Sequence, residues 1–336
     1  MIMVAQALER QVVSGHIRPF VPHRDMAGLA TLIETAFGPE LAATGSHIVQ
    51  DLRQMAMLGP FLRPTGRVVA PFAGLVWIED GRLVGNISLS PEKHDGHVWT
   101  VSNVAVLPEY RGRGIGGQLV DAGISLARER EARRLLLQVR ADNAVAIGLY
   151  RHRGFVTVDT VHDLLLHRYA WPGSVGAPGG TLRRPRLADR MAIRALRGRP
   201  QPHPVLWQAN LLLRYLVTGE RTLEVVAAPE GEVVGYAIAE AHAQGGPHEV
   251  SLYTRPGRRG RWEAAMLEWL LARLRAGAAR PVRTTISAQH LEALEAAESL
   301  GFRTVRVLDQ MELDLAPSPS RERAVRHAGA VHSLSA

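Results

Sequence analysis

The chain has 336 residues and no cysteine, which excludes several chemistries at once. Without a thiol it can form no disulfide, no thiolate nucleophile and no cysteine-ligated zinc site. No apolar run approaches the roughly 20 residues that a membrane-spanning helix needs. The first residues, Met1–Gln6, lack the basic and apolar regions of a signal peptide. We therefore expect a globular, cytoplasmic protein without membrane association.

Aromatic residues and lysine are also scarce. Aromatics make up 5% of the chain, and Lys93 is the only lysine although Lys and Arg together number 40. The net charge of +8 would suit a polyanionic partner. Nucleic-acid-binding proteins, however, combine basic runs with stacking aromatics, and no such run occurs. We do not expect nucleic acid to be the main partner.

Glycine, by contrast, is concentrated in one place. Four glycines lie within residues 112–117, between the apolar pattern of Val98–Leu107 and a helical pattern that starts at about residue 115. Glycine is costly at a helix start, so the cluster needs a reason. Backbone N–H groups without neighbouring Cβ atoms can face one bound group, and the helix dipole favours an anion there. The pattern predicts a pyrophosphate nest, with Arg111 and Arg113 at its edge.

This stretch resembles motif A of the GNAT superfamily, the acyl-CoA-dependent N-acetyltransferases. In that motif a Val-Ala-Val-x-Pro strand precedes Gln/Arg-x-x-Gly-x-Gly/Ala. Here Val104–Pro108 precedes Arg111-x-x-Gly114-x-Gly116. The resemblance implies that the strand backbone binds the pantetheine arm of acetyl-CoA and that the loop amides bind its pyrophosphate. No metal is implied.

A second stretch, Leu137–Phe155, resembles motif B of the same superfamily. Asn143 and Tyr150 are seven residues apart, two helical turns, and so face the same way. The resemblance implies that Asn143 contacts the pantetheine arm and that Tyr150 is the general acid for the departing thiolate. From the pattern alone, Tyr150 is a core aromatic of an amphipathic helix. The acetyl-CoA-binding residues implied by both motifs are Val104, Ala105, Val106, Arg111, Gly112, Arg113, Gly114, Ile115, Gly116, Gly117 and Asn143.

The general base is left open by the sequence. Family members often place Glu or His on the motif A strand or at the start of motif B, where this chain has Thr100, Ser102 and Gln138. These neutral residues are candidates for contacting substrate or relaying a proton through water. The missing base leaves a non-catalytic acyl-CoA-binding or regulatory protein as the alternative. A nicotinamide enzyme fits less well, because the glycine pattern does not directly follow a first strand and its turn.

The second half of the chain repeats the first. Arg259-Gly260-Arg261 corresponds to Arg111-Gly112-Arg113, and Ser299–Phe302 corresponds to His152–Phe155, with spacings of 148 and 147 residues. The acetyl-CoA motifs are altered in this second copy, so we expect a degenerate GNAT-like domain there. In the second copy Trp262, Glu263, Ala264, His290 and Ala297 stand where the first has Gly114, Ile115, Gly116, Asn143 and Tyr150.

The predicted fold class is α/β (α+β), with two tandem GNAT domains, each a mixed, mostly antiparallel sheet flanked by helices. We expect Asp25 to cap a helix through about Ala36, a further helix near 48–57, and two closing strands at Phe155–Val158 and Leu164–Leu166. The predicted divisions are a catalytic domain at 1–170, a linker at 171–180, a degenerate domain at 181–315 and a mobile tail at 316–336.

The predicted function is direct transfer of an acetyl group from acetyl-CoA, the co-substrate, to a primary amine. A small-molecule amine or a peptide N-terminus is the expected acceptor. The oligomeric state stays open.

Overall fold

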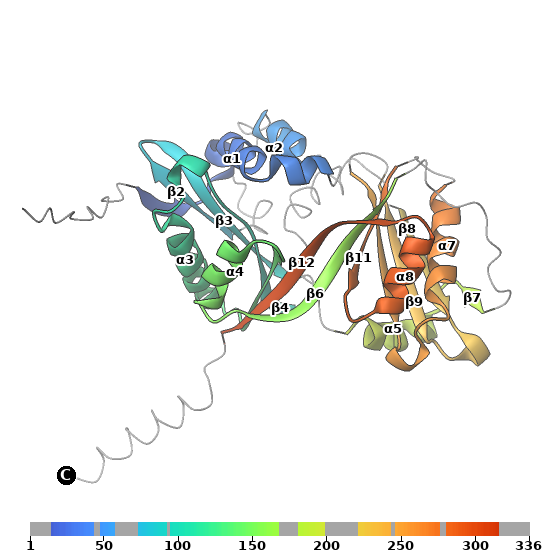
Figure 1. Ribbon diagram of the computed structural model, residues 1–336. Helices are drawn as coiled ribbons and strands as arrows, with labels where there is room; N and C mark the ends of the chain where they lie inside the picture. Colours follow the sequence, from blue (N-terminus) through green and yellow to red (C-terminus); the bar gives the residue numbers. More distant parts are fainter. Residues whose placement is uncertain are drawn as a thin grey trace, which may run out of the picture.

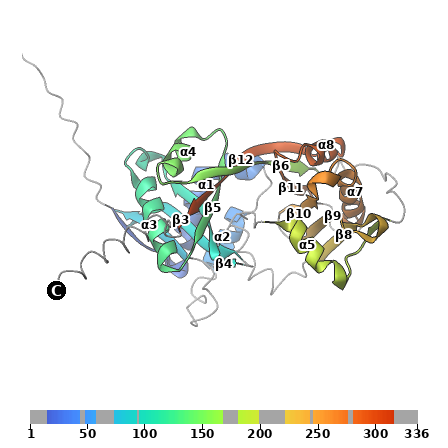
Figure 2. The same ribbon diagram turned by 90° about the horizontal axis from the view of Figure 1, so that it is seen from below.

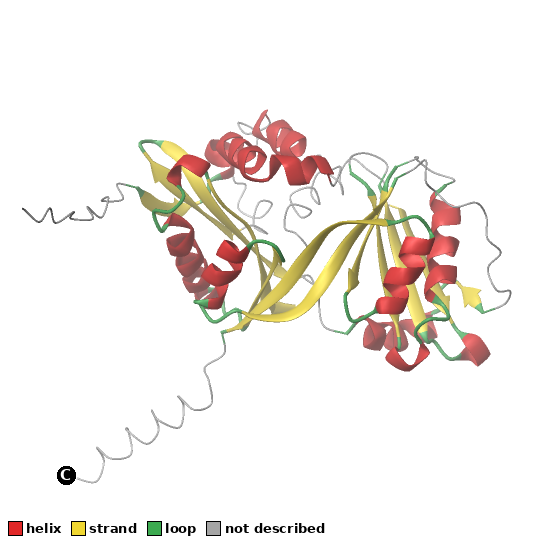
Figure 3. Cartoon of the chain, viewed as in Figure 1, coloured by secondary structure: helices red, strands yellow, loops and turns green. Residues whose placement is uncertain are grey.

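The computed structural model describes residues 15–43, 48–57, 73–92, 95–167, 181–198, 221–242, 246–275 and 280–315. Within these ranges twelve strands form one mixed sheet with helices on its faces (Figures 1 and 3). None of the helices in this part of the chain is long and apolar enough to cross a membrane. The predicted linker at 171–180 and tail at 316–336 lie outside the described residues.

The first copy runs from β1 to β6. Its strands β2 and β3 are joined by Asp80-Gly81, a dipeptide typical of hairpins: both residues have positive φ, 48° and 76°, as a two-residue turn between twisted strands requires. The elements are β1 (His16–Pro19), α1 (Pro22–Ala43), α2 (Ile48–Met57), β2 (Ala73–Glu79), β3 (Arg82–Glu92), β4 (Asp95–Val106), α3 (Ile115–Glu129), β5 (Arg134–Arg140), α4 (Ala144–Arg151) and β6 (Val156–Leu166).

Two local predictions were wrong. Helix α1 begins at Pro22 rather than at Asp25 and continues past Ala36 to Ala43. Asp25 lies inside the first turn, where its carboxylate accepts two bonds from Arg18, each 2.6 Å, and one from the Val21 amide. The ion pair with Arg18, rather than an N-cap role, explains why an aspartate stands at position 25. The two predicted closing strands are one continuous strand, β6, because it pairs along its length with strands of the second copy.

The second copy repeats this order. Arg183 and Asp189 form the same ion pair as Arg18 and Asp25, at 2.6 Å. Between β8 and β9 a turn again places a non-glycine residue, Glu230, at positive φ. The elements are β7 (Leu182–Arg183), α5 (Arg190–Arg197), β8 (Arg221–Ala227), β9 (Gly235–Ala241), β10 (His248–Thr254), α7 (Glu263–Leu274), β11 (Val282–Ser287), α8 (Leu291–Ser299) and β12 (Arg303–Asp314).

The two copies exchange their last strands. The sheet order is β1-β2-β3-β4-β5-β12-β6-β11-β10-β9-β8-β7, so β12 pairs with β5 of the first copy and β6 pairs with β11 of the second. Figures 1 and 2 show these two long strands running through the middle of the molecule. Val161 lies opposite Leu308, and these two residues are 147 positions apart, the spacing of the repeat. The exchange is therefore symmetric about this central pair.

The exchanged strands carry core residues for the other copy. Met311 and Leu313 of β12 are buried in the hydrophobic core that α3 and α4 cover in the first copy. Leu164 and Leu166 of β6 are buried in the core under α7 in the second copy. Neither core is complete without a strand from the other half of the chain.

Candidate active site

The site begins where β4 and β5 separate. The two strands pair in parallel only from Val98–Arg134 to Thr100–Leu136 and then diverge. Beyond the last pair, β4 bulges at Asn103, which has φ of 52°. Buried Asn86 on β3 holds the bulge by donating from Nδ2 to the Asn103 carbonyl at 3.0 Å. Sequence analysis missed both asparagines, although asparagine tolerates the left-handed conformation better than most residues.

The glycine-rich loop enters α3 as predicted. Gly112 and Gly114 have φ of 77° and 79°, and Gly114 is the N-cap of α3. A Cβ on either glycine would meet nothing within 4 Å, so the backbone conformation, not crowding by protein, requires glycine here. Within the described part of the chain, the amides of residues 112–117 donate to no acceptor. They form an open array at a helix N-terminus, which suits an anion such as pyrophosphate.

The other predicted loop residues mainly hold the loop in shape. Arg111 donates from Nε to the Val106 carbonyl at 3.0 Å. Arg113 bonds Glu79 at 3.2 Å and the Glu109 carbonyl at 3.0 Å. Arg113 therefore anchors the loop and is partly neutralised.

Gly117 has a packing reason of its own. A Cβ there would lie 2.6 Å from a guanidinium nitrogen of Arg153. Arg153 in turn bonds Asp121 of α3 at 2.7 and 2.9 Å. Glycine at 117 thus leaves room for the Arg153 guanidinium, which would otherwise have to shift. Contact of this residue with a cofactor stays a prediction.

Helix α4 carries both motif B residues. Asn143 is its N-cap and accepts from the Ala146 amide at 3.0 Å. Tyr150 is buried edge-to-face against Phe155, with ring centroids 5.7 Å apart. Its hydroxyl forms no hydrogen bond within the described residues. Burial raises the pKa of Tyr150 above its usual value, so the phenol keeps its proton at neutral pH.

On the other face of the sheet, four hydroxyl side chains make a polar floor, defined as Ser88, Ser90, Thr100 and Ser102. Ser90 lies opposite Thr100, and Ser88 lies opposite Ser102. The hydroxyls of Ser90 and Ser102 are buried without a partner. Two of the three predicted relay residues are thus together in this floor. The third, Gln138, lies on β5 beyond the point of separation, opposite Gln310.

A carboxylate that sequence analysis missed lies at the edge of this floor. Glu92, at the end of β3, accepts a 2.6 Å hydrogen bond from Thr100. The only sequence signal for it is the alternation Ser88, Ser90, Glu92, which places the three side chains on one face of a strand. Glu92 is half-buried, so it remains within reach of water.

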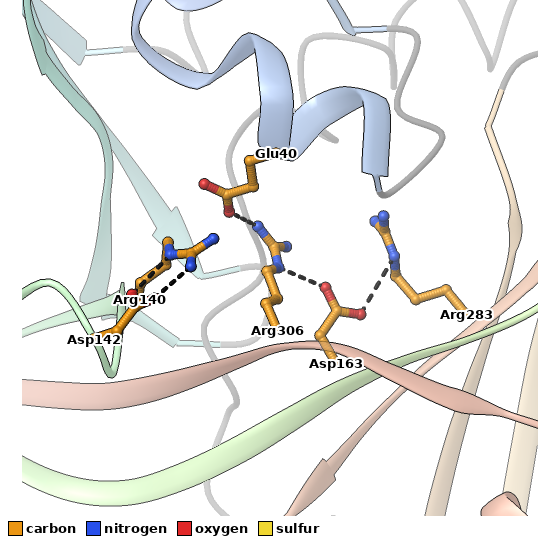
Figure 4. Close-up of polar contacts among 6 residues, drawn as sticks. All are labelled: Glu40, Arg140, Asp142, Asp163, Arg283 and Arg306. Atoms are coloured by element: carbon orange, nitrogen blue, oxygen red, sulfur yellow. Dashed lines mark hydrogen bonds and ion pairs between the residues drawn. The ribbon is translucent and has the colours of Figure 1, made fainter.

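A row of charges closes the same face below the end of α1 (Figure 4). Arg306 of β12 pairs with Glu40 of α1 and bonds Asp163 at 2.7 Å, and Asp163 lies 3.4 Å from Arg283. Burial alone would lower the pKa of Arg306, but the charges of Asp163 and Glu40 outweigh it and raise that pKa. A residue from the second copy therefore contributes a fixed positive charge beside the first copy's site.

In the second copy the corresponding loop is already filled. Trp262 is buried at the N-cap position of α7, where α3 has Gly114. The buried Glu263 carboxylate accepts from the Trp262 amide at 3.0 Å and from His290 at 2.9 Å. Burial alone would raise the pKa of Glu263, but His290 and the amides of Glu263, Trp262 and Gly260 outweigh it and lower that pKa to about 2. An internal carboxylate thus takes the place of a bound anion.

This carboxylate predicts a pH-dependent contribution to stability. Because the pKa of Glu263 is lowered from 4.5 to about 2, its contribution is complete above pH 4.5 and is lost as the pH falls toward 2. Glu263→Gln should lower the free energy of unfolding by about 3 kcal/mol at pH 7, with a much smaller difference at acid pH. Denaturant titrations of both proteins at pH 7 and at acid pH measure this difference in the free energy of unfolding. Glu268→Gln, on the same helix, is the control, and equal effects of the two changes would contradict the assignment.

Comparison with known proteins supports the resemblance to the GNAT superfamily. Residues 47–155 match the model of the acetyltransferase (GNAT) family. This stretch is therefore a GNAT acetyltransferase domain, and it contains the glycine loop and both motifs. A solved GCN5-related N-acetyltransferase from Sphaerobacter thermophilus aligns over 91% of this chain and 97% of its own, with a TM-score of 0.63 and 18% identity. A tandem GNAT protein from the clavulanic acid biosynthesis pathway aligns over 90% and 99%, with a TM-score of 0.55 and 19% identity. The whole chain thus has the tandem GNAT fold.

Curated relatives match over shorter stretches. A mycothiol acetyltransferase from Thermobispora bispora is 33% identical over 154 residues, 44% of this chain and 48% of its own length. A putative [ribosomal protein bS18]-alanine N-acetyltransferase from Bacillus subtilis is 39% identical over 85 residues, 25% of this chain and 54% of its own. The chain spans about half the length of the curated relatives it matches.

Proposed function

We propose that the first copy is an acetyl-CoA-dependent N-acetyltransferase that transfers the acetyl group directly to a primary amine. The observation that carries this proposal is the contrast between the two glycine loops. The amides of residues 112–117 are open, whereas the equivalent loop of the second copy is filled by Trp262 and Glu263. The first loop can receive a pyrophosphate, and the resemblance to the family motifs assigns the pantetheine arm to Asn143 and the β4 backbone.

The residues around the strand separation suit the two proton movements of the reaction. The amine nitrogen attacks the thioester carbonyl carbon, the C–N bond forms, and the C–S bond breaks. The departing thiolate, with a pKa near ~8.5, takes a proton or a strong hydrogen bond from the Tyr150 phenol. The proton lost by the amine passes along the polar floor from Thr100 to Glu92, with Ser102 and Gln138 positioned to order water. A backbone N–H at the β4 bulge polarises the carbonyl.

The acceptor enters from the face that carries the polar floor. The walls of this acceptor site are α1 and the charged row of Glu40, Arg306 and Asp163. A small-molecule amine or a short peptide N-terminus fits such a polar, charged surface. The two curated relatives, named for mycothiol and for the alanine of a ribosomal protein, are of these two kinds.

Calorimetric titration of acetyl-CoA into the full chain tests the proposal. We expect one site per chain, because only one of the two loops is open. Amines are then screened by thiol release from acetyl-CoA, which is clean because the protein has no cysteine. Glu92→Gln should slow the reaction with any active amine and leave acetyl-CoA binding unchanged. Two sites, or no binding, would contradict the proposal.

A further inference from the structure

Helix α5 presents a basic face to solvent. Residues 183–197 contain six arginines and one aspartate, an excess of five positive charges in a chain whose net charge is +8. Arg190, Arg194 and Arg197 follow one another at intervals of four and three residues, so they share one side of the helix, and all three are exposed. Within the described part of the chain, no carboxylate pairs with these three guanidinium groups. This basic face therefore suits an acidic partner.

The basic face stands where the first copy has an apolar contact. The ion pair shared by the two copies aligns α5 with α1, so the three arginines correspond to Met26, Ala30 and Ile33. Those three side chains are buried in a cluster between α1 and α2. Arginines cannot make such an apolar contact, because burying unpaired charges is costly. The sequence that follows α5, residues 199–220, contains a single acidic residue, Glu220, and so offers no matching set of carboxylates.

Helix α8 presents a face of the opposite charge. Glu292, Glu295 and Glu298 follow one another at intervals of three residues and so lie along one side of the helix. Glu295 and Glu298 are exposed, and Glu292 is half-buried. Among the described residues, no cation pairs with these carboxylates. The equivalent helix of the first copy, α4, has no acidic residue, so this acidic face is also particular to the second copy.

Exposed apolar side chains accompany both charged faces. Leu187 and Met191, beside the arginines, are 78% and 76% exposed. Leu291, one turn before Glu295 on α8, is 62% exposed. Apolar side chains next to unpaired charges are the composition of a protein interface, with an apolar centre and a polar rim.

The two charged faces lie on opposite sides of the sheet. Successive residues of β8 point to opposite sides. Val226 belongs to the cluster against which Ile193 of α5 packs. Val225 belongs to the cluster that contains Ala293 of α8. Figure 2 shows α5 and α8 with β8–β10 between them. One molecule therefore cannot join its own two faces, and a two-fold symmetric dimer cannot use both of them at once.

We propose that the second copy mediates head-to-tail self-association, in which the basic face of α5 in one molecule binds the acidic face of α8 in the next. The arginines pair with the glutamates across the contact, and Leu187 and Met191 pack near Leu291. A phosphate backbone or an anionic lipid surface would match α5 alone, whereas a second copy of the chain matches both faces. The net charge of +8 opposes association at long range, but a Debye length of about 8 Å at physiological salt screens it more than ion pairs in contact.

Sedimentation velocity of the full chain at increasing protein concentration, in about 0.15 M salt, tests the proposal. We expect the average mass to rise above that of one chain and to keep rising, because a head-to-tail contact leaves a free face at each end. Two variants each remove one face by changing three residues to glutamine, a good helix former. The basic-face variant carries Arg190→Gln, Arg194→Gln and Arg197→Gln, and the acidic-face variant carries Glu292→Gln, Glu295→Gln and Glu298→Gln. Each variant alone should stay monomeric.

A mixture of the two variants gives the sharper result. The acidic-face variant keeps α5 and the basic-face variant keeps α8, so one contact can form between them and cannot be repeated. The mixture should give a 1:1 dimer that does not grow with concentration. A control that changes the exposed residues Arg128, Arg130 and Arg133 to glutamine lowers the net charge by the same three units and should associate like the parent protein. Melting temperatures and acetyl-CoA binding should be unchanged in all variants, which separates this test from that of the proposed function.

Three results would overturn the proposal: a parent protein that is monomeric at every concentration, association that persists in both variants, or a variant mixture that contains only monomers. A monomeric parent protein whose α5 arginines are instead needed to bind phosphatidylglycerol vesicles or duplex RNA would assign the basic face to another partner and would overturn it as well.

Discussion

Ending the chain after Phe302, and so removing β12, is expected to abolish folding of both copies and all acetyl-CoA binding. Strand β12 lies between β5 and β6, and its loss leaves two interior strands with unpaired backbone groups. It also removes Met311 and Leu313 from the first copy's core. A single buried Met→Ala change already costs about 2–5 kcal/mol, which is a large part of the stability of a typical domain.

The matched control ends the chain after Leu315, which keeps every described strand. Circular dichroism, denaturant titration and acetyl-CoA calorimetry compare the two shortened chains with the full one. The control should behave like the full chain in all three. A point variant makes the same test without truncation: Met311→Ala, a change in the second copy, should destabilise the first copy's core. If residues 1–180 alone folded and bound acetyl-CoA, the strand exchange would be dispensable.

This dependence of the first copy on β12 gives the second copy a physical role. Its own anion site is closed by Glu263, yet it supplies the strand that completes the first copy's sheet. It also supplies Arg306, which pairs with Glu40 of α1 and with Asp163 of β6. If the second copy binds no acetyl-CoA, as we propose, its packing against the first copy still explains why it is retained.

Features set by short stretches of sequence were predictable. The Asp80-Gly81 turn and the glycine loop depend on backbone conformations that few residues adopt, and the start of α4 needs a side-chain acceptor such as that of Asn143. Their positions can therefore be read directly from the sequence. The substitutions at 262 and 263 are likewise visible in the sequence as changes to the acetyl-CoA motif. That Glu263 itself satisfies the loop amides needed the structure, because its side-chain direction is not a sequence property.

Features set by pairing between distant segments were not predictable. Strand β12 has the same alternation whether it pairs with its own copy or the other, so the pattern cannot specify the exchange. Glu92 meets Thr100 only across two strands, and Glu40 meets Arg306 across almost the whole chain. The length of α1 was underestimated because Asp25 looks like a cap in sequence, whereas its ion pair with Arg18 explains it in the structure.

Replacing Tyr150 by phenylalanine is expected to lower kcat about 10²–10⁴-fold with little change in acetyl-CoA affinity or stability. General acid catalysis contributes an effect of this size. The ring, and with it the edge-to-face contact with Phe155, is retained. The hydroxyl bonds no described residue, so its removal breaks no structural hydrogen bond. Thiol-release kinetics, acetyl-CoA calorimetry and thermal melting measure the three quantities. Tyr110→Phe, in the loop before α3, is the matched control.

The pH dependence of the parent protein gives an independent test of the same assignment. Because burial raises the pKa of Tyr150 above 10, the phenol stays protonated throughout the range from pH 7 to 9. Deprotonation of Tyr150 should therefore cause no alkaline fall in kcat within this range. A fall near pH 8 that disappears in Tyr150→Phe would mean that the phenol titrates in an exposed site. An unchanged rate in Tyr150→Phe would show that Tyr150 is not the general acid. If the protein bound acetyl-CoA tightly but turned over no amine, the non-catalytic alternative would be favoured.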